Sequence, residues 1–573
     1  MSRRTRGPWL GLLLLALPAP LPAGAEPADL VLRNAAVYTV DRVRSWADAL
    51  AIAEGRIRYV GSDAGVAPFV GEGTRVVDLG GRMVLPGFQD AHVHPVQSGY
   101  VQDQCSLFEL AGLEAVLAAV KACIEARPGE GWIRGGGWPL DLFLPTGLPD
   151  KKWLDELAPG RPVVLESSDG HTLWVNSAAL RLAEIGPDTA DPPGGRIDRY
   201  PGRREPSGSL QESAMGLMTA RMPEPTDAEL VQGLRRALAL LNGFGVTAIQ
   251  DAIVKFEGSD GYRSFPAYRA LDDRGELSLR VVAAMMWDNQ APIDEQIPRF
   301  VEARERESRG RVRATSVKIW QDGVIEPATA ALLEPYLDSK EGSRGELLNS
   351  PERLNRAVTL LDAHGFQVHF HAIGDRAIRT SLDAVAAARA ANGVRDSRHH
   401  ISHLELLDSA DIPRFRELDV VANFQPLWAF ADTYITDLTL PRIGPARSRW
   451  LYAMASVRDS GAVLAFGSDW FVSSANPLLG IETAVTRLGP LGETDRVFLP
   501  EERISLADAI AAYTIGSAYV NFLDRETGSI EGGKLADLVV LDRNLFAIPA
   551  AEISDARVVA TLLDGQLVYG SLP

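Results

Sequence analysis

The feature that most constrains the fold is an alternation of short apolar runs with longer helix-like stretches through the middle of the 573-residue chain. The runs include RPVVLES, VTAIQDA, RVVAAMM, ATSVKIW, FQVHFHAI, HHISHLEL, VVANFQPL and AVLAFGSD. Strands that alternate with helices form parallel sheets, and about eight such units favour an α/β fold closed into a (β/α)8 barrel of the TIM type. An open doubly wound sheet is the alternative. No Gly-rich loop with G-x-G-x-x-G spacing follows a strand, so a nucleotide cofactor is not indicated.

The two chain ends differ from the middle in their sequence pattern. Both consist of short strand-like runs broken by Gly and Asp, such as LVLRNAAVYTV near the start and VVATLLDGQLVYG near the end. We therefore expect the ends, residues 26–85 and 525–573, to meet in one small β-sandwich domain. The barrel then spans residues 86–524.

The first 25 residues indicate a secretory signal peptide. Three arginines among the first six residues precede an apolar run over residues 9–17, and the small residues Ala23-Gly24-Ala25 follow. The apolar run is shorter than the roughly 20 residues that span a bilayer, so we expect cleavage near Ala25 rather than a stable membrane anchor. The predicted destination of the mature chain is the periplasm or the medium.

The charge balance excludes one class of partner. The chain has 75 acidic and 58 basic residues, a formal charge of −17, which repels nucleic acid and anionic membranes. We expect a small-molecule substrate instead, and a homodimer is the default for a soluble oligomer.

The two cysteines, Cys105 and Cys123, flank a helix expected over residues 113–126. They are either one disulfide, which an oxidising compartment permits, or two buried thiols.

The nine histidines concentrate at predicted strand ends. In LPGFQDAHVHP, strand alternation places Asp90, His92 and His94 on one face, at the end where a barrel builds its active site. In GFQVHFHAIGD, His371 is nearer the strand end and is the better ligand, whereas His369 lies deeper and is expected to be a hydrogen-bonded core residue.

Two further strands end in side chains that bind metals. In RHHISHLEL, His403 takes the terminal position, while His399 and His400 are expected to be structural or exposed. In AVLAFGSDW, Asp469 follows small residues that leave space in the barrel lumen, where it could accept a proton or contact a metal. A cap of the next helix is the alternative role for Asp469.

Lys318 is one of only seven lysines, yet it lies within the apolar strand ATSVKIW. A buried charge is costly unless it is paired or modified. Unlike arginine, lysine can lose its proton when buried, and carbon dioxide can then convert it to a carbamate that bridges two metals. The alternative is a buried ion pair with Asp322 or Glu326.

Taken in order, these motifs resemble the amidohydrolase superfamily, and more narrowly the family-three branch that includes N-substituted formamide deformylase and many exported hydrolases. The resemblance runs from about residue 29 to the C-terminus and rests on PGFQDAHVHP, VKIWQDG, HFHAIGD, ISHLEL, FGSDW and TGSIEGGKLADLVVLD. It implies a metal-loaded barrel carried by a β-sandwich. By position, the implied metal ligands are His92, His94, carboxylated Lys318, His371, His403 and Asp469.

With these positions assigned, 224 residues separate His94 from Lys318, more than the intervening barrel units need. An inserted lid or subdomain is therefore expected within about 100–230. It contains DGHTLWVNSAAL and PSGSLQESA, both similar to motifs of the branch. From it His171 is predicted to bind substrate, with Asp322 from the barrel, and Glu212 is a weaker candidate. Three insertion tryptophans either wall an apolar pocket or form the insertion's own core: Trp138, Trp153 and Trp174.

The predicted activity is hydrolysis of a non-peptide C–N bond, of the amide type, by metal-activated hydroxide. Two divalent ions, for which zinc is expected, lower the pKa of the water bound to them. Asp469 acts as the catalytic base. Without the carbamate, a single ion held by four of these ligands suits a deaminase-like reaction on a heterocycle. An exported metal-binding or solute-binding protein is the alternative outside catalysis.

Overall fold

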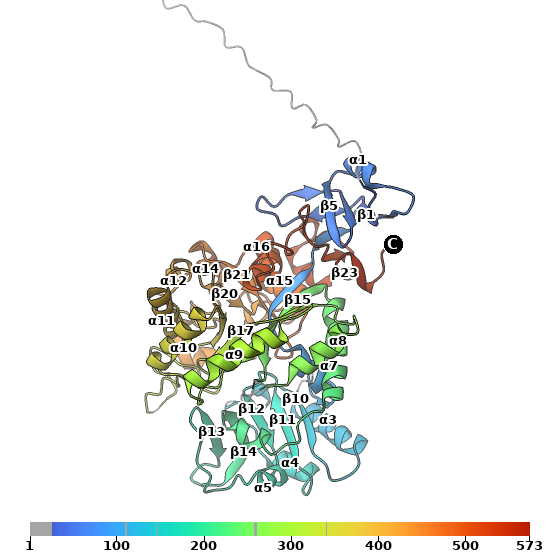
Figure 1. Cartoon of the computed structure of the whole chain (residues 1–573). Helices are drawn as coiled ribbons and strands as arrows, with labels where there is room; N and C mark the ends of the chain where they lie inside the picture. The colour runs from blue at the N-terminus through green and yellow to red at the C-terminus, as the bar shows by residue number, and fades with distance from the viewer. Residues whose placement is uncertain (1–25, 109, 111, 145, 257–260, 340) are drawn as a thin grey trace, which may run out of the picture.

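The computed structural model describes residues 26–108, 110, 112–144, 146–256, 261–339 and 341–573 (Figure 1). The predicted signal peptide lies outside the described residues. At the centre is a parallel sheet of eight strands, each hydrogen-bonded to the next in chain order. These strands are β8 (Phe88–Val93), β15 (Val246–Val254), β16 (Arg280–Met286), β17 (Val312–Trp320), β18 (Gln367–Ala372), β19 (His400–His403), β20 (Val421–Phe424) and β21 (Leu464–Phe466).

The first and last strands of this sheet meet at their carboxyl ends. The Asp469 amide donates to the His92 carbonyl at 2.7 Å, and the His94 amide donates to the Trp470 carbonyl at 3.0 Å. Gly467 allows this approach, because a Cβ there would lie 2.6 Å from the His92 nitrogen. The predicted TIM-type barrel is therefore confirmed, and the alternative of an open sheet is wrong.

Helices surround the barrel, as the βα rhythm predicts. α7 shows why they form where they do: Thr226 and Glu229 make a reciprocal capping box at its start, and Leu230, Leu234 and Leu241 bury one face. The other main barrel helices are α8 (Ser264–Asp272), α9 (Ile293–Glu307), α10 (Pro351–Ala363), α11 (Asp375–Asn392), α12 (Ile412–Glu417), α14 (Met454–Asp459), α15 (Pro477–Thr486) and α16 (Leu506–Ala511), with α7 itself at Asp227–Gly243. None of the helices in the described ranges is long and apolar enough to cross a membrane.

Strands from both chain ends lie together at the top of Figure 1, in blue and red. One sheet has the order β5 (Arg56–Gly61), β4 (Ala49–Ala53), β1 (Leu30–Arg33), β6 (Arg75–Asp78). The other has the order β24 (Gln566–Gly570), β23 (Val558–Leu563), β22 (Leu538–Leu541), β7 (Met83–Pro86), β2 (Ala36–Tyr38), β3 (Trp46–Ala47). The ends join where β7 pairs with β22, and one apolar cluster contains buried residues of both, such as Leu32 and Leu562.

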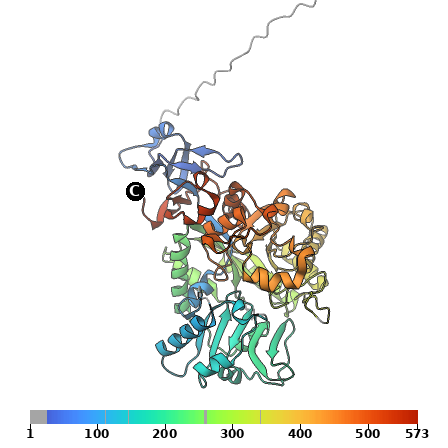
Figure 2. The ribbon, with the colours of Figure 1, turned by 180° about the vertical axis from the view of Figure 1, so that it is seen from behind.

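A third sheet forms a separate lobe between β8 and β15 in the chain, below the barrel in Figure 2. Its order is β13 (Gly195–Arg199), β14 (Pro206–Glu212), β12 (Thr172–Val175), β11 (Val163–Ser167), β10 (Ile133–Trp138), β9 (Cys105–Ser106). The run RPVVLES, predicted with the barrel strands, forms β11 here. A short apolar strand flanked by helices has the same pattern in both sheets, so the sequence pattern did not separate them.

The helix expected over residues 113–126 is α3 (Leu113–Ala126). It runs back along the preceding chain, and Cys105 and Cys123 form a disulfide with their Cα atoms 5.6 Å apart. Of the two possibilities for the cysteines, the structure therefore has the bridge. Trp138 and Trp174 are fully buried in the lobe's own core, with Trp153 packed against it, so they do not wall a substrate pocket.

Candidate metal centre

All six predicted ligands line a single cavity of about 500 Å³ at the carboxyl end of the barrel. Each is more than nine-tenths buried. They come from the ends of different strands, which parallel pairing holds side by side: His92 from β8, His94 directly after it, Lys318 from β17, His371 from β18, His403 from β19, and Asp469 after β21.

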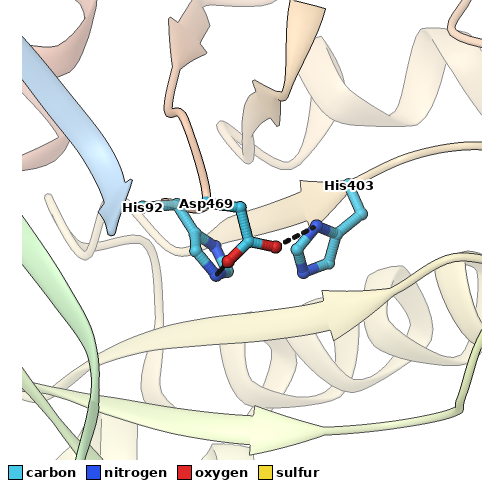
Figure 3. Close-up of side chains that lie close together, drawn as sticks. All are labelled: His92, His403 and Asp469. Atoms are coloured by element: carbon cyan, nitrogen blue, oxygen red, sulfur yellow. Dashed lines mark ion pairs between the residues drawn. The ribbon is translucent and has the colours of Figure 1, made fainter. Parts of the chain in front are cut away.

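Asp469 lies between His92 and His403 (Figure 3), and His94 is its third histidine neighbour. Its Oδ1 is 2.7 Å from His94 Nε2 and 3.4 Å from His92 Nε2, and its Oδ2 is 3.7 Å from His403 Nδ1. Burial alone would raise the pKa of Asp469, but His92 and His94 outweigh burial and hold that pKa well below its usual range. The carboxylate is therefore ionised, and it caps no helix, since α15 begins at Pro477.

Several buried polar atoms of this cluster have no hydrogen-bond partner among the described residues. Both ring nitrogens of His403 are in this state, as is His94 Nδ1. Buried polar atoms are normally satisfied, and imidazole nitrogens beside a carboxylate are the donor set of a zinc-type cation. His92, His403 and Asp469 each offer a ligand atom within 4.8 Å of the others. The residues thus fit a divalent metal ion.

The backbone at two of these residues is strained. His403 has φ 80° and Asp469 has φ 54°, in the left-handed region that residues other than glycine seldom adopt. Such conformations persist only where the surroundings enforce them, and they concentrate at functional sites. Here His403 ends β19 and Asp469 lies in the turn after β21, and both side chains line the cavity.

A second layer of side chains holds the ligands. His92 Nδ1 lies 2.9 Å from His369 Nε2, which also lies 2.8 Å from Ser402 Oγ, so His369 is the hydrogen-bonded core residue that the sequence predicts. His399 and His400 are both buried and structural: His399 accepts from the Val368 amide, and His400 bonds Gln250.

The amine of Lys318 lies within hydrogen-bond distance of one of the predicted histidine ligands. Its Nζ lies 3.3 Å from His92 Nε2, and burial lowers the pKa of the amine to about 7. The two carboxylates considered as its ion-pair partners are engaged elsewhere. Asp322 accepts backbone N–H groups, and Glu326 accepts from the Thr439 hydroxyl.

Asp322 is not where the sequence placed it. Its carboxylate accepts from the amides of Ala331, Ile373 and Gly374, and it is absent from the cavity lining. Its Oδ1 is 4.0 Å from His371 Nε2. The chain after β17 folds back over this carboxylate, so Asp322 organises the loop behind His371 rather than facing substrate.

The inserted lobe brings a His–Glu pair to the same cavity. His171, just before β12, has its ring centre 5.3 Å from that of His371, and its Nδ1 is 2.9 Å from Glu212 Oε2. Burial would lower the pKa of His171, but Glu212 outweighs burial and raises that pKa to about 9. Glu212 Oε1 accepts from Thr329 Oγ1 of the barrel at 2.8 Å, which ties the lobe to the barrel.

The sequence marks Glu212 only weakly and singles out neither Asp169 nor Arg134, yet all three line the cavity. Asp169 Oδ1 accepts from the His171 amide at 3.2 Å and so orients the turn that carries the imidazole. The nearness of Asp169 to His171 in the sequence was the available signal. Nothing in the local pattern GWIRGGGW marks Arg134.

The comparisons with known proteins cover most of the chain. The model of the amidohydrolase family matches residues 75–569. Protein LONG AFTER FAR-RED 3 of Arabidopsis thaliana is 35% identical over 96% of this chain and 92% of its own length. N-substituted formamide deformylase of Arthrobacter pascens is 28% identical over 94% and 98%. The solved structure of an uncharacterized metal-dependent hydrolase from Pyrococcus furiosus is 25% identical, with a TM-score of 0.68 over 90% of this chain and 99% of that one. The chain therefore belongs to the amidohydrolase family, and it is a metal-dependent hydrolase.

Proposed function

We propose that this hydrolase cleaves an amide-type C–N bond other than a peptide bond, using two zinc ions per chain. The observation that carries the proposal is the cluster of partnerless imidazole nitrogens around an ionised aspartate, all facing one cavity. The similarity to a formamide deformylase over nearly the whole chain is consistent with this bond type.

The residues that would hold the metals are the six side chains at the barrel rim. Lys318 would contribute as a carbamate: its unprotonated amine attacks carbon dioxide, an N–C bond forms, and one proton is released. Burial supports this step because it brings the pKa of the amine to about 7, so that much of it is uncharged at neutral pH. The resulting anion would lie beside His92.

When bound, the metal ions supply hydroxide at neutral pH and polarise the scissile carbonyl. The proton transfers are carried out by a residue of the chain itself. Asp469, buried and held ionised by His92 and His94, accepts the proton of the attacking water at a carboxylate oxygen. It then returns that proton to the departing nitrogen, because an unprotonated amide nitrogen is a very poor leaving group.

His171 would bind the substrate carbonyl or leaving group from the opposite wall. Glu212 takes its Nδ1–H, which leaves Nε2 as the ring atom that can face the substrate. Because this carboxylate is itself bonded to Thr329, the imidazole has a fixed position relative to the barrel. The ion pair with Glu212 favours the charged imidazolium, a strong donor to a developing oxyanion.

The compartment of the protein is part of the proposal. The arginine-rich, apolar leader supports export to the periplasm or medium, and the Cys105–Cys123 disulfide suits an oxidising environment. Expression with and without residues 1–25, followed by fractionation of the cells, tests it. Retention of the full-length chain inside the cell would contradict export.

The primary experiment is metal analysis of protein purified with zinc and bicarbonate, comparing wild type with Lys318→Ala. We expect two ions per chain, falling to one or fewer in the variant, followed by turnover on a panel of N-substituted formamides, cyclic amides and acylated amines. One ion in both proteins would favour a mononuclear, deaminase-like hydrolase. No metal in either would overturn the proposed mechanism.

A further inference from the structure

Arg134 lies in the wall of the catalytic cavity, on the side built by the inserted lobe. It belongs to β10, and the next residue, Gly135, is paired with Cys105 of β9. Cys105 is in turn bridged to α3 through Cys123. Arg134 therefore lies on a strand whose neighbour is held in place by a disulfide, and not on a loop.

Arg134 is bonded to neutral acceptors rather than to a carboxylate. Its guanidinium donates to the Tyr100 hydroxyl at 3.2 Å and to the Pro223 carbonyl at 2.5 Å, and both acceptors are neutral. Within the described part of the chain it forms no ion pair. A guanidinium has five N–H donors, so these two bonds fix its orientation and leave further donors for a ligand.

Two other basic side chains of the cavity lining, which follow the barrel strand β15, are paired with carboxylates. Lys255 Nζ lies 2.8 Å from Glu224 Oε1, and Arg263 lies 3.4 Å from both Glu224 and Asp227. Arg134 therefore differs from its neighbours in lacking an acidic partner, although all three basic residues line the same cavity.

Nearby acids are also engaged elsewhere. Glu229 accepts from the amide and hydroxyl of Thr226 as part of the α7 capping box, and its charge attracts Arg134 without an ion pair between them. Glu166 lines the cavity, but its Oε1 lies 3.5 Å from Gln97 Nε2, and burial raises its pKa to about 7, which weakens it as a counterion.

We propose that Arg134 is a specificity-determining residue that binds a carboxylate of the substrate, which makes N-acyl amino acids the substrate class. The scissile amide would lie at the barrel rim and the carboxylate at β10. Guanidinium and carboxylate match in a bidentate, charge-assisted pair. Apolar residues of the lobe wall, including Leu173, Met215 and Met222, would receive the amino-acid side chain. This inference rests on the proposed amide hydrolysis and specifies it further.

The test measures binding separately from turnover. Racemic N-acetylphenylalanine and its uncharged primary amide are titrated calorimetrically into zinc-loaded Asp469→Asn protein, which is expected to bind without hydrolysing. We expect the carboxylate to bind about tenfold or more tightly than the amide. Adding Arg134→Met should remove that preference, Arg134→Lys should keep part of it, and the matched control Lys255→Met should keep all of it.

The outcomes separate this inference from the proposed function. Equal binding of the two ligands, no binding of either, or a preference that survives Arg134→Met would overturn the role of Arg134, whatever the metal count. Conversely, a preference that depends on Arg134 in a protein holding one ion would sustain the carboxylate site and overturn only the two-metal mechanism. The Arg134→Lys variant guards against a loss that merely reflects misfolding.

Discussion

The two walls of the catalytic cavity are built in different ways. The barrel wall takes its side chains from the ends of adjacent parallel strands, so their positions follow from the pairing of the sheet. The lobe wall takes His171 from a turn and Glu212 from the end of an antiparallel strand, and Thr329 links that pair to the barrel. A barrel can therefore keep its metal chemistry while the inserted wall changes what is bound.

The largest expected effect lies on the barrel wall. Asp469→Asn removes the proton acceptor but keeps the shape of the side chain, so turnover should fall by about 10²–10⁴-fold. Metal content should stay largely intact, because the imidazole nitrogens remain. Steady-state kinetics and metal analysis of the same preparation check both halves, and substantial turnover by the variant would exclude Asp469 as the base.

A smaller loss is expected on the lobe wall. His171→Gln should lower kcat/KM by about a hundredfold, the typical cost of one lost oxyanion donor, while metal content is unchanged. Glu212→Gln should cost less, because the amide still holds the imidazole in place but no longer favours its charge. Loss of metal in either variant would contradict the division between the two walls.

The matched control for this pair is His364→Gln, which alters an exposed histidine far along the chain, at the end of α10. It should leave both kinetics and metal content as in the wild type. If His364→Gln slows turnover as His171→Gln does, the effect on the lobe wall is not specific.

The barrel wall was largely predictable from sequence. Strand alternation and the rule that parallel strands present their carboxyl ends together place His92, His94, His403 and Asp469 without any tertiary information. Asp322 was not predictable in this way, because its role depends on how the following loop folds back onto it. Side-chain chemistry alone did not distinguish a carboxylate that caps backbone N–H groups from one that faces substrate.

The lobe was harder to predict for two reasons. Its strand β11 has the composition of a barrel strand, so the pattern did not reveal to which sheet it belongs. Its contacts with the cavity also join residues far apart in sequence: His171 meets Glu212 and, through it, Thr329. Local periodicity carries no information on such long-range pairs.

The disulfide offers a way to perturb one wall alone. A Cys105→Ser/Cys123→Ser double variant removes the disulfide, which joins two residues of the lobe 18 positions apart. The loss should lower the free energy of unfolding of the lobe by about 3 kcal/mol. Hydrogen exchange should rise in β9, β10 and α3 while the barrel strands keep their protection and the zinc content is unchanged. Exchange that rises equally across the barrel would mean that lobe and barrel unfold as one unit.

The smallest expected effect is a pH dependence of stability from the His171–Glu212 pair. The pKa of His171 is raised from 6.5 to about 9 in the folded chain, so the folded state binds the proton more tightly than the unfolded state does. The pair therefore stabilises the protein fully below pH 6.5, and the gain disappears as pH rises through 9. The carboxylates of Asp169 and Asp469 also favour the charged imidazole.

The measurement compares metal-free wild type with Glu212→Gln by urea unfolding between pH 6 and 9.5, because bound zinc would add its own pH dependence. We expect the wild type to be more stable by about 1–3 kcal/mol at pH 6, with the difference shrinking towards pH 9.5. A difference that stays constant with pH would mean that Glu212 acts through packing and its bond to Thr329. In that case the lobe wall would hold His171 by shape alone, and the charged donor proposed for catalysis would lose its support.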